Sequence, residues 1–155
     1  MSKQIVTQHV TATLSLVGRQ EVTIDSHDSD GPGSHITVAF AGVILWFYDL
    51  PSVQAYRRVW TETAARIYAA SLPATRDLAV TPVGQFAPTV GVRAAAGDAP
   101  DVQPRGDCLI VKMGHITWAV YDRAAFDHQV TTWQRVGQLA DLILPDRYIP
   151  TLPRR

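Results

Sequence analysis

Cysteine and lysine are nearly absent from this chain, whose only cysteine is Cys108 and whose only lysines are Lys3 and Lys112. A single cysteine excludes a framework of intrachain disulfides, and such usage is typical of a reducing compartment. We therefore expect a cytoplasmic protein. Because 14 basic side chains balance 14 acidic ones, no global field would attract the chain to nucleic acid or to anionic lipid.

Long apolar runs are missing too. The longest one, residues 43–48, has the length of a strand, whereas a membrane-spanning helix needs roughly 18 apolar residues or more. The first residues lack the apolar segment of a secretory signal. We expect neither a membrane span nor a membrane partner.

The composition that remains is that of a globular protein, with 155 residues, 46% hydrophobic and 18% charged. A chain of this length buries about 70% of the surface that its unfolded form exposes, which suffices for an ordinary core. We predict a single domain over residues 1–155.

An internal repeat organises the sequence. With an offset of 73 residues, five identities align without a gap: Gly33 with Gly106, Val38 with Val111, Tyr48 with Tyr121, Asp49 with Asp122, and Trp60 with Trp133. Both segments end in Leu-Pro, at residues 72–73 and 144–145. We predict one repeat over residues 5–73, a second over residues 77–145 and a tail over residues 146–155. The alternative is that two segments of strands and helix match through shared patterning alone.

Strands fill the first part of each repeat. In the first repeat, alternating or continuous apolar residues predict strands over residues 10–16, 21–25, 36–40 and 43–48. Turns are expected at residues 18–19 and 41–42. In the second repeat, strands are predicted over residues 109–113 and 116–121. Pro82 and Pro88 restrict residues 78–95 to edge or bulged strands, and residues 97–106, rich in Asp and Pro, predict a loop.

A helix follows the last strand of each repeat. Asp49 and Asp122 are the predicted N-caps, because a carboxylate there accepts hydrogen bonds from free backbone N–H groups, and Pro51 suits a first turn. The first helix should bury Val53, Tyr56, Trp60, Ala64 and Ile67 and end before Pro73. The second should bury Phe126, Val130, Trp133, Gly137 and Ala140.

Side-chain alternation sorts the two hairpins into unequal faces. The apolar face, which should lie under the helices, consists of Ile36, Val38, Phe40, Val43, Leu45, Phe47, Leu109, Val111, Met113, Ile116, Trp118 and Val120. The mixed face consists of Thr37, Ala39, Ile44, Trp46, Tyr48, Ile110, Lys112, Thr117, Ala119 and Tyr121. The predicted fold class is α+β, with tandem strand-rich ββββα units, an antiparallel sheet and two amphipathic helices on one face.

The mixed face and the first helix carry the candidate binding residues. These are Trp46, Tyr48, Tyr121, Lys112, Arg57 and Arg58. Aromatic rings beside small and polar groups suit a partner surface or a platform on which flat ligands stack. The alternatives are that the mixed face packs on the sheet of the other repeat and that the arginines form a solvated helix surface.

Residues 25–35 gather three carboxylates and two imidazoles on one connection. The candidate metal ligands are Asp25, His27, Asp28, Asp30 and His35. Two imidazoles and a carboxylate could make an open zinc or iron site. The alternative is turn chemistry, since Asp and Ser hydrogen-bond their own backbone and Gly31 and Gly33 permit positive φ. Cys108 is predicted to be a small core residue rather than a thiolate nucleophile.

The repeated ββββα order resembles, at the level of topology, the tandem units of the PUR, Whirly and PC4-like single-strand nucleic-acid-binding proteins. The resemblance spans both repeats and implies curved sheets that carry basic and aromatic residues. This chain departs from that pattern, because it is neutral and has only Lys112 as a cation on its mixed face.

The leading functional hypothesis is a non-enzymatic binding or protein-interaction module that self-associates, as a homodimer, and needs no cofactor. Single-stranded nucleic-acid binding through the mixed aromatic face is the alternative. A second alternative is a metal-dependent hydrolase that uses the loop of Asp and His residues. No Gly-rich phosphate loop and no nucleophile elbow occurs in the sequence.

Overall fold

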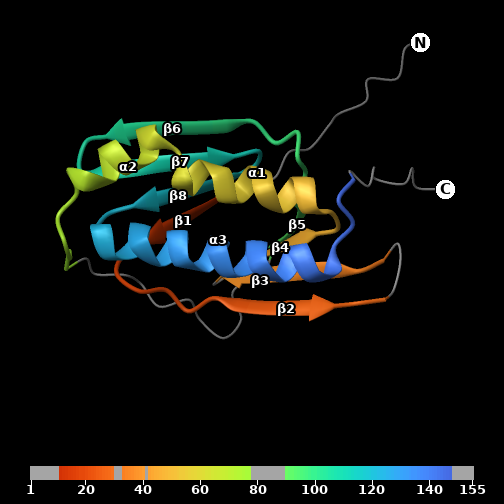
Figure 1. Ribbon diagram of the computed structural model, residues 1–155. Helices are drawn as coiled ribbons and strands as arrows, with labels where there is room; N and C mark the ends of the chain where they lie inside the picture. Colours follow the sequence, from red (N-terminus) through yellow and green to blue (C-terminus); the bar gives the residue numbers. More distant parts are fainter. Residues whose placement is uncertain (1–10, 30–32, 41, 78–89, 148–155) are drawn as a thin grey trace, which may run out of the picture.

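The computed structural model describes residues 11–29, 33–40, 42–77 and 90–147 (Figure 1). Its strands are β1 (Ala12–Leu16), β2 (Thr23–His27), β3 (His35–Phe40), β4 (Val43–Phe47), β5 (Val90–Arg93), β6 (Pro100–Arg105), β7 (Cys108–Met113) and β8 (Ile116–Val120). Its helices are α1 (Leu50–Thr61), α2 (Thr63–Ala70) and α3 (Arg123–Ile143). The α+β class is therefore confirmed. Val10, Asp30 and residues 78–89, on which predictions fell, lie outside the described residues.

The strands form two mixed four-stranded sheets, in the orders β2-β3-β4-β5 and β1-β8-β7-β6. In each sheet three strands are antiparallel, and the fourth is parallel: β5 pairs with β4, and β1 pairs with β8. The prediction of one antiparallel sheet is therefore wrong. β1 and β2 belong to different sheets, so residues 18–19 connect the sheets instead of closing a hairpin.

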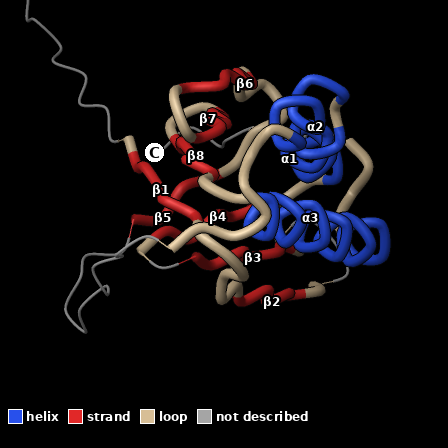
Figure 2. Tube along the Cα trace, turned by 90° about the vertical axis from the view of Figure 1, so that its left-hand side faces the viewer, coloured by secondary structure: helices blue, strands red, loops and turns tan. Residues whose placement is uncertain are grey.

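The helices lie together on one side of both sheets, with α1 beside α3 (Figures 1 and 2). β6 and β2 lie at opposite ends of the arrangement, and β1 and β5 lie between them (Figure 2). No helix in the described part of the chain is both long enough and apolar enough to cross a membrane.

The core forms where the apolar hairpin face meets the helices. All twelve residues predicted for that face are buried. Trp118 of β8 connects the two helices, since its ring centroid lies 5.7 Å from that of Trp60 in α1 and 6.5 Å from that of Trp133 in α3. The sequence pattern therefore predicted the core face of both hairpins correctly.

The first predicted helix is in fact two helices. Glu62 adopts an extended conformation, with φ −65° and ψ 147°, and separates α1 from α2. The interruption shifts the helical phase, so Ala65 and Ala69 are buried. Ala64 is exposed and Ile67 is 63% exposed, and the prediction that both are buried is wrong.

The predicted loop over residues 97–106 is also wrong in part, because strand β6 occupies most of it. Two prolines, Pro100 and Pro104, lie in this strand, which pairs only with β7 and is an edge. Proline is tolerated on an edge strand because its missing N–H can face away from the neighbouring strand.

Both predicted N-caps are confirmed. The Asp49 carboxylate accepts a hydrogen bond from Ser52 N at 2.8 Å, and that of Asp122 accepts one from Ala125 N at 2.7 Å. The buried Asp122 carboxylate accepts two further backbone N–H groups, from Gly18 at 3.0 Å and from Arg76 at 3.1 Å. It therefore ties the β1–β2 connection and the segment after α2 to the start of α3.

The two Leu-Pro sequences occupy matching places. The carbonyl of Pro73 accepts the N–H of Arg123 at the start of α3 at 2.9 Å, and that of Pro145 accepts the N–H of Leu50 at the start of α1 at 2.8 Å. The 73-residue offset also relates the bounds of β3 to those of β7 and of β4 to those of β8. The early strands do not keep this offset, and an origin by duplication stays a hypothesis.

Trp60 and Trp133 are both fully buried. We expect Trp60→Ala and Trp133→Ala each to lower the free energy of unfolding by about 3–5 kcal/mol, because each leaves a large cavity in a packed core. Chemical denaturation measures the loss. An unchanged stability in both variants would contradict the assigned core.

Removing the Asp122 carboxylate should be more damaging than removing an ordinary helix cap, which costs about 1 kcal/mol. We expect Asp122→Ala to lower the free energy of unfolding by about 3 kcal/mol, because three backbone N–H groups, one buried and two part-buried, lose their carboxylate acceptor. Asp127→Ala, at an exposed position of the same helix, is the matched control and should change stability little. A loss for Asp122→Ala no larger than that of the control would show that the junction is not a stabilising contact.

Candidate functional site

The outer face of the β2-β3-β4-β5 sheet, opposite the helices, gathers aromatic and cationic side chains from four segments. Because Ile36, Leu45 and Phe47 point into the core, their neighbours along the strands point outward. We name as the ring cluster His27 of β2, His35 of β3, Trp46 of β4, Tyr48 just after β4, and Arg93 of β5. The strand register brings these side chains together, because it pairs His27 with His35 and Trp46 with Arg93.

His35 lies at the centre of the ring cluster. Its ring centroid is 5.1 Å from that of His27, 5.3 Å from that of Trp46 and 5.8 Å from that of Tyr48. Arg93 completes the cluster, with its Cζ 4.7 Å from the Tyr48 ring centroid, in a cation–π arrangement. The side chains of the ring cluster therefore form one continuous patch.

The ring cluster is only partly shielded from solvent. His27 is exposed, and the other four side chains are half-buried. Beside them, β5 carries Gly91, where an added Cβ would lie 3.6 Å from the Trp46 Nε1 atom. Gly91 therefore lies directly beside the indole, at ordinary van der Waals distance. Trp, Tyr and Arg are the residue types that dominate the energy of protein interfaces.

The candidate binding residues do not all meet. Tyr121 and Lys112 lie on the outer face of the other sheet, where Arg76 Cζ lies 5.4 Å from the Tyr121 ring centroid. Arg57 and Arg58 belong to α1, and the Arg57 side chain packs against Gly137 of α3. Only Trp46 and Tyr48 of the predicted set therefore belong to the ring cluster.

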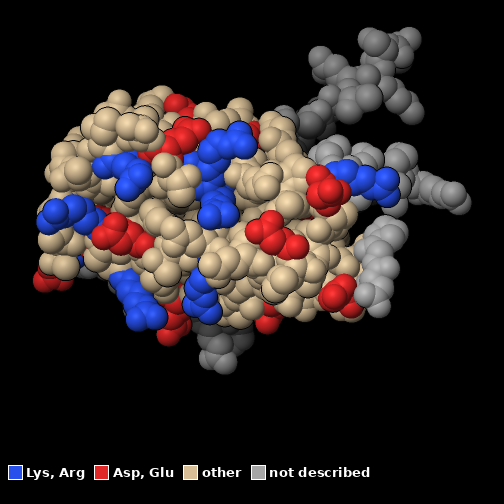
Figure 3. Space-filling model, viewed as in Figure 1, with Lys and Arg blue, Asp and Glu red and all other residues tan. Residues whose placement is uncertain are grey.

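The helix side of the molecule offers no single-sign surface. Figure 3 views that side and shows Lys and Arg interspersed with Asp and Glu. This distribution agrees with the equal numbers of acidic and basic residues in the sequence. A continuous basic groove is therefore not a feature of this face.

The candidate metal ligands are spread over two strands and their connection. Asp25 and His27 lie in β2, and His35 begins β3, so the prediction that all five ligands share one loop is wrong. Asp28 follows β2 and accepts a 3.4 Å hydrogen bond from the Ser34 hydroxyl. Among the described residues, which exclude Asp30, no group of three or more His, Cys, Asp and Glu side chains could hold a metal ion.

Cys108 is not the core residue that the sequence predicted. It is half-buried at the start of β7, and its thiol donates a 3.4 Å hydrogen bond to the Arg105 carbonyl. Burial raises the pKa of this thiol, which disfavours the thiolate. The position therefore suits neither core packing nor a nucleophile.

The chain matches no protein-family model, no curated protein and no solved structure. Its resemblance to single-strand nucleic-acid-binding proteins stays a prediction. Sequence reasoning missed one member of the ring cluster, Arg93, because the strand that carries it lies in a segment whose pairing could not be predicted.

Proposed function

We propose that this protein is a non-enzymatic interaction module that self-associates through the outer face and edge of the β2-β3-β4-β5 sheet. The ring cluster is the observation that carries the proposal. The three helices cover the opposite face of the sheets (Figure 2), so the aromatic area of Trp46 and Tyr48 is left for a partner.

Charge favours a protein partner over a nucleic acid. The ring cluster contains one guanidinium, that of Arg93. Asp25 lies on the same outer face, two residues along β2 from His27. Nucleic-acid binding depends on the neutralisation of several phosphates by lysine and arginine. A patch of rings with a single cation instead has the chemistry of a protein interface.

The sheet edge favours a second copy as the partner. β2 is an edge strand with no proline, and its side chains are mostly exposed. Two β2 strands can pair antiparallel about a twofold axis at Ser26, which sets Asp25 of one copy opposite His27 of the other. At directly facing positions a carboxylate can accept a hydrogen bond from an imidazole N–H, which stabilises a pair of strands. This pairing would also join two ring clusters into one surface.

We expect the purified protein to be a dimer and Trp46→Glu to be a soluble monomer, because the substitution buries an unpaired carboxylate at the contact. Light scattering coupled to size-exclusion chromatography measures the mass. Lys112→Glu is the control, because Lys112 is exposed on the outer face of the other sheet. This variant should stay dimeric.

The same measurements can refute the proposal. A wild-type monomer at every accessible concentration would contradict self-association. If such a monomer bound single-stranded DNA, and Trp46→Ala weakened that binding by about 1–3 kcal/mol, the ring cluster would instead be a base-stacking platform.

The pairing about Ser26 makes a sharper prediction. In the Cys108→Ser background, Ser26→Cys should form a covalent dimer on mild oxidation, because facing residues of antiparallel strands have Cα atoms about 4.5–5.5 Å apart, within disulfide range. Non-reducing electrophoresis detects the dimer. Gln103→Cys, on exposed edge strand β6, is the control and should stay monomeric on the gel. Equal crosslinking of both variants would mean random collision rather than a defined contact.

A further inference from the structure

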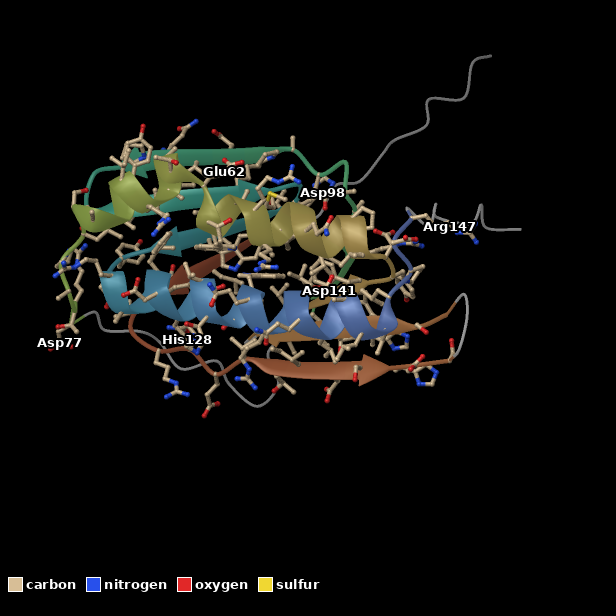
Figure 4. All side chains as sticks on the ribbon, viewed as in Figure 1. Glu62, Asp77, Asp98, His128, Asp141 and Arg147 are labelled. Atoms are coloured by element: carbon tan, nitrogen blue, oxygen red, sulfur yellow. The ribbon has the colours of Figure 1, made fainter. Side chains whose placement is uncertain are left out.

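A hollow of about 380 Å³ lies between the β1–β2 connection and one face of α3. It is lined by Arg19, Ala124, Asp127, His128, Thr131, Thr132 and Arg135. A second hollow of about 370 Å³ shares Arg19, His128, Thr132 and Arg135 with the first and continues along residues 20–24. Figure 4 shows His128 on the side of α3 that faces this connection.

Helical spacing brings the donors of this hollow together. His128, Thr132 and Arg135 follow one another at intervals of four and three residues, so they share one face of α3. Arg19 approaches that face from the β1–β2 connection. The hollow thus holds two guanidinium groups and an imidazole contributed by two separate segments.

The two guanidinium groups are not used in ion pairs within the described chain. The ion pair found there joins Arg76 to Asp107, and neither Arg19 nor Arg135 belongs to one. The acidic side chains that line the two hollows are Asp127 and Glu21. Two arginines beside a hollow that form no ion pair with any described residue can bind an anionic ligand.

The His128 ring is oriented as a donor. Its Nδ1 atom accepts a 3.3 Å hydrogen bond from the backbone N–H of Gln20, so the neutral ring carries its proton on Nε2. The hydroxyls of Thr131 and Thr132 donate to carbonyls of α3. The remaining side-chain donors are therefore Arg19, Arg135 and His128 Nε2–H.

The electrostatics of the hollow agree with this arrangement. Burial, followed by the Arg19 and Arg135 guanidinium groups, lowers the pKa of His128. The charged groups that line the hollows around His128 are Arg19 and Glu21 from the β1–β2 connection, and Asp127 and Arg135 from α3. An anion between the two arginines would oppose their effect and raise the pKa of His128.

We propose that this hollow binds the phosphate group of a small organic phosphate, held by Arg19, Arg135 and His128. A guanidinium group matches the oxygens of a phosphate, which accept two parallel hydrogen bonds from it. The volumes suit a small molecule, since ligand pockets measure about 300–1,000 Å³. The second hollow, along residues 20–24, has room for the organic part.

The test is a titration with inorganic phosphate and with sulfate, followed by NMR at the His128 ring and at backbone amides. Sulfate stays doubly negative across neutral pH, whereas inorganic phosphate titrates there. With sulfate, any titration that is observed therefore belongs to the protein. Both anions should shift the signals of Arg19, His128 and Arg135, and sulfate should raise the pKa of His128. Arg19→Gln and Arg135→Gln should each weaken sulfate binding about tenfold.

The control is Arg66→Gln, at an exposed position of α2 outside the hollows, which should bind sulfate like the wild type. Equal weakening in all three variants, or no response of His128 to either anion, would overturn the proposal. Binding to vesicles that contain phosphatidylserine, without any response to soluble phosphate, would overturn the small-molecule assignment in favour of a lipid headgroup. Arg19, His128 and Arg135 lie outside β2 and outside the ring cluster, so a dimer that binds no anion would refute this inference alone.

Discussion

Parallel pairing between the two halves of the chain is the constraint on which the rest of the structure depends. β1 completes the sheet of β6, β7 and β8, and β5 completes the sheet of β2, β3 and β4. Neither half therefore has a complete sheet without a strand from the other. The Asp122 carboxylate holds the chain where it leaves β1, and the Pro73 carbonyl holds the start of α3. The ring cluster also depends on this pairing, because its Arg93 lies on β5, a strand of the second half.

Local patterns in the sequence predicted what depends on near neighbours. Period-two alternation gave the buried face of both hairpins, and the positions of Asp49 and Asp122 gave the helix starts, because caps and strand faces are determined within a few residues. Pairing between distant strands does not depend on residues that are close in the sequence. The sequence therefore did not predict that β1 joins the sheet of the second half and β5 that of the first. The break at Glu62 was missed because no glycine or proline marks it.

The candidate site was predictable to the same degree. Trp46 and Tyr48 could be assigned to one face from alternation alone, whereas their contact with His35 and Arg93 depends on register across three strands. His27 and His35 were predicted as metal ligands because their spacing in the sequence suggested that both lie in one loop. In the fold they face each other across β2 and β3, and there they belong with the aromatic rings.

The prolines of β6 also bear on how large an assembly can grow. β2 and β6 lie at opposite ends of the molecule (Figure 2), and Pro100 and Pro104 remove backbone donors from β6. A molecule that paired at both of these outermost strands could add copies at each and extend into a fibre. With pairing at β6 disfavoured by its prolines, the proposed pairing through β2 would be self-complementary and would use the outermost strand of both copies. Under the pairing proposed above, growth through these two outermost strands would stop at two copies.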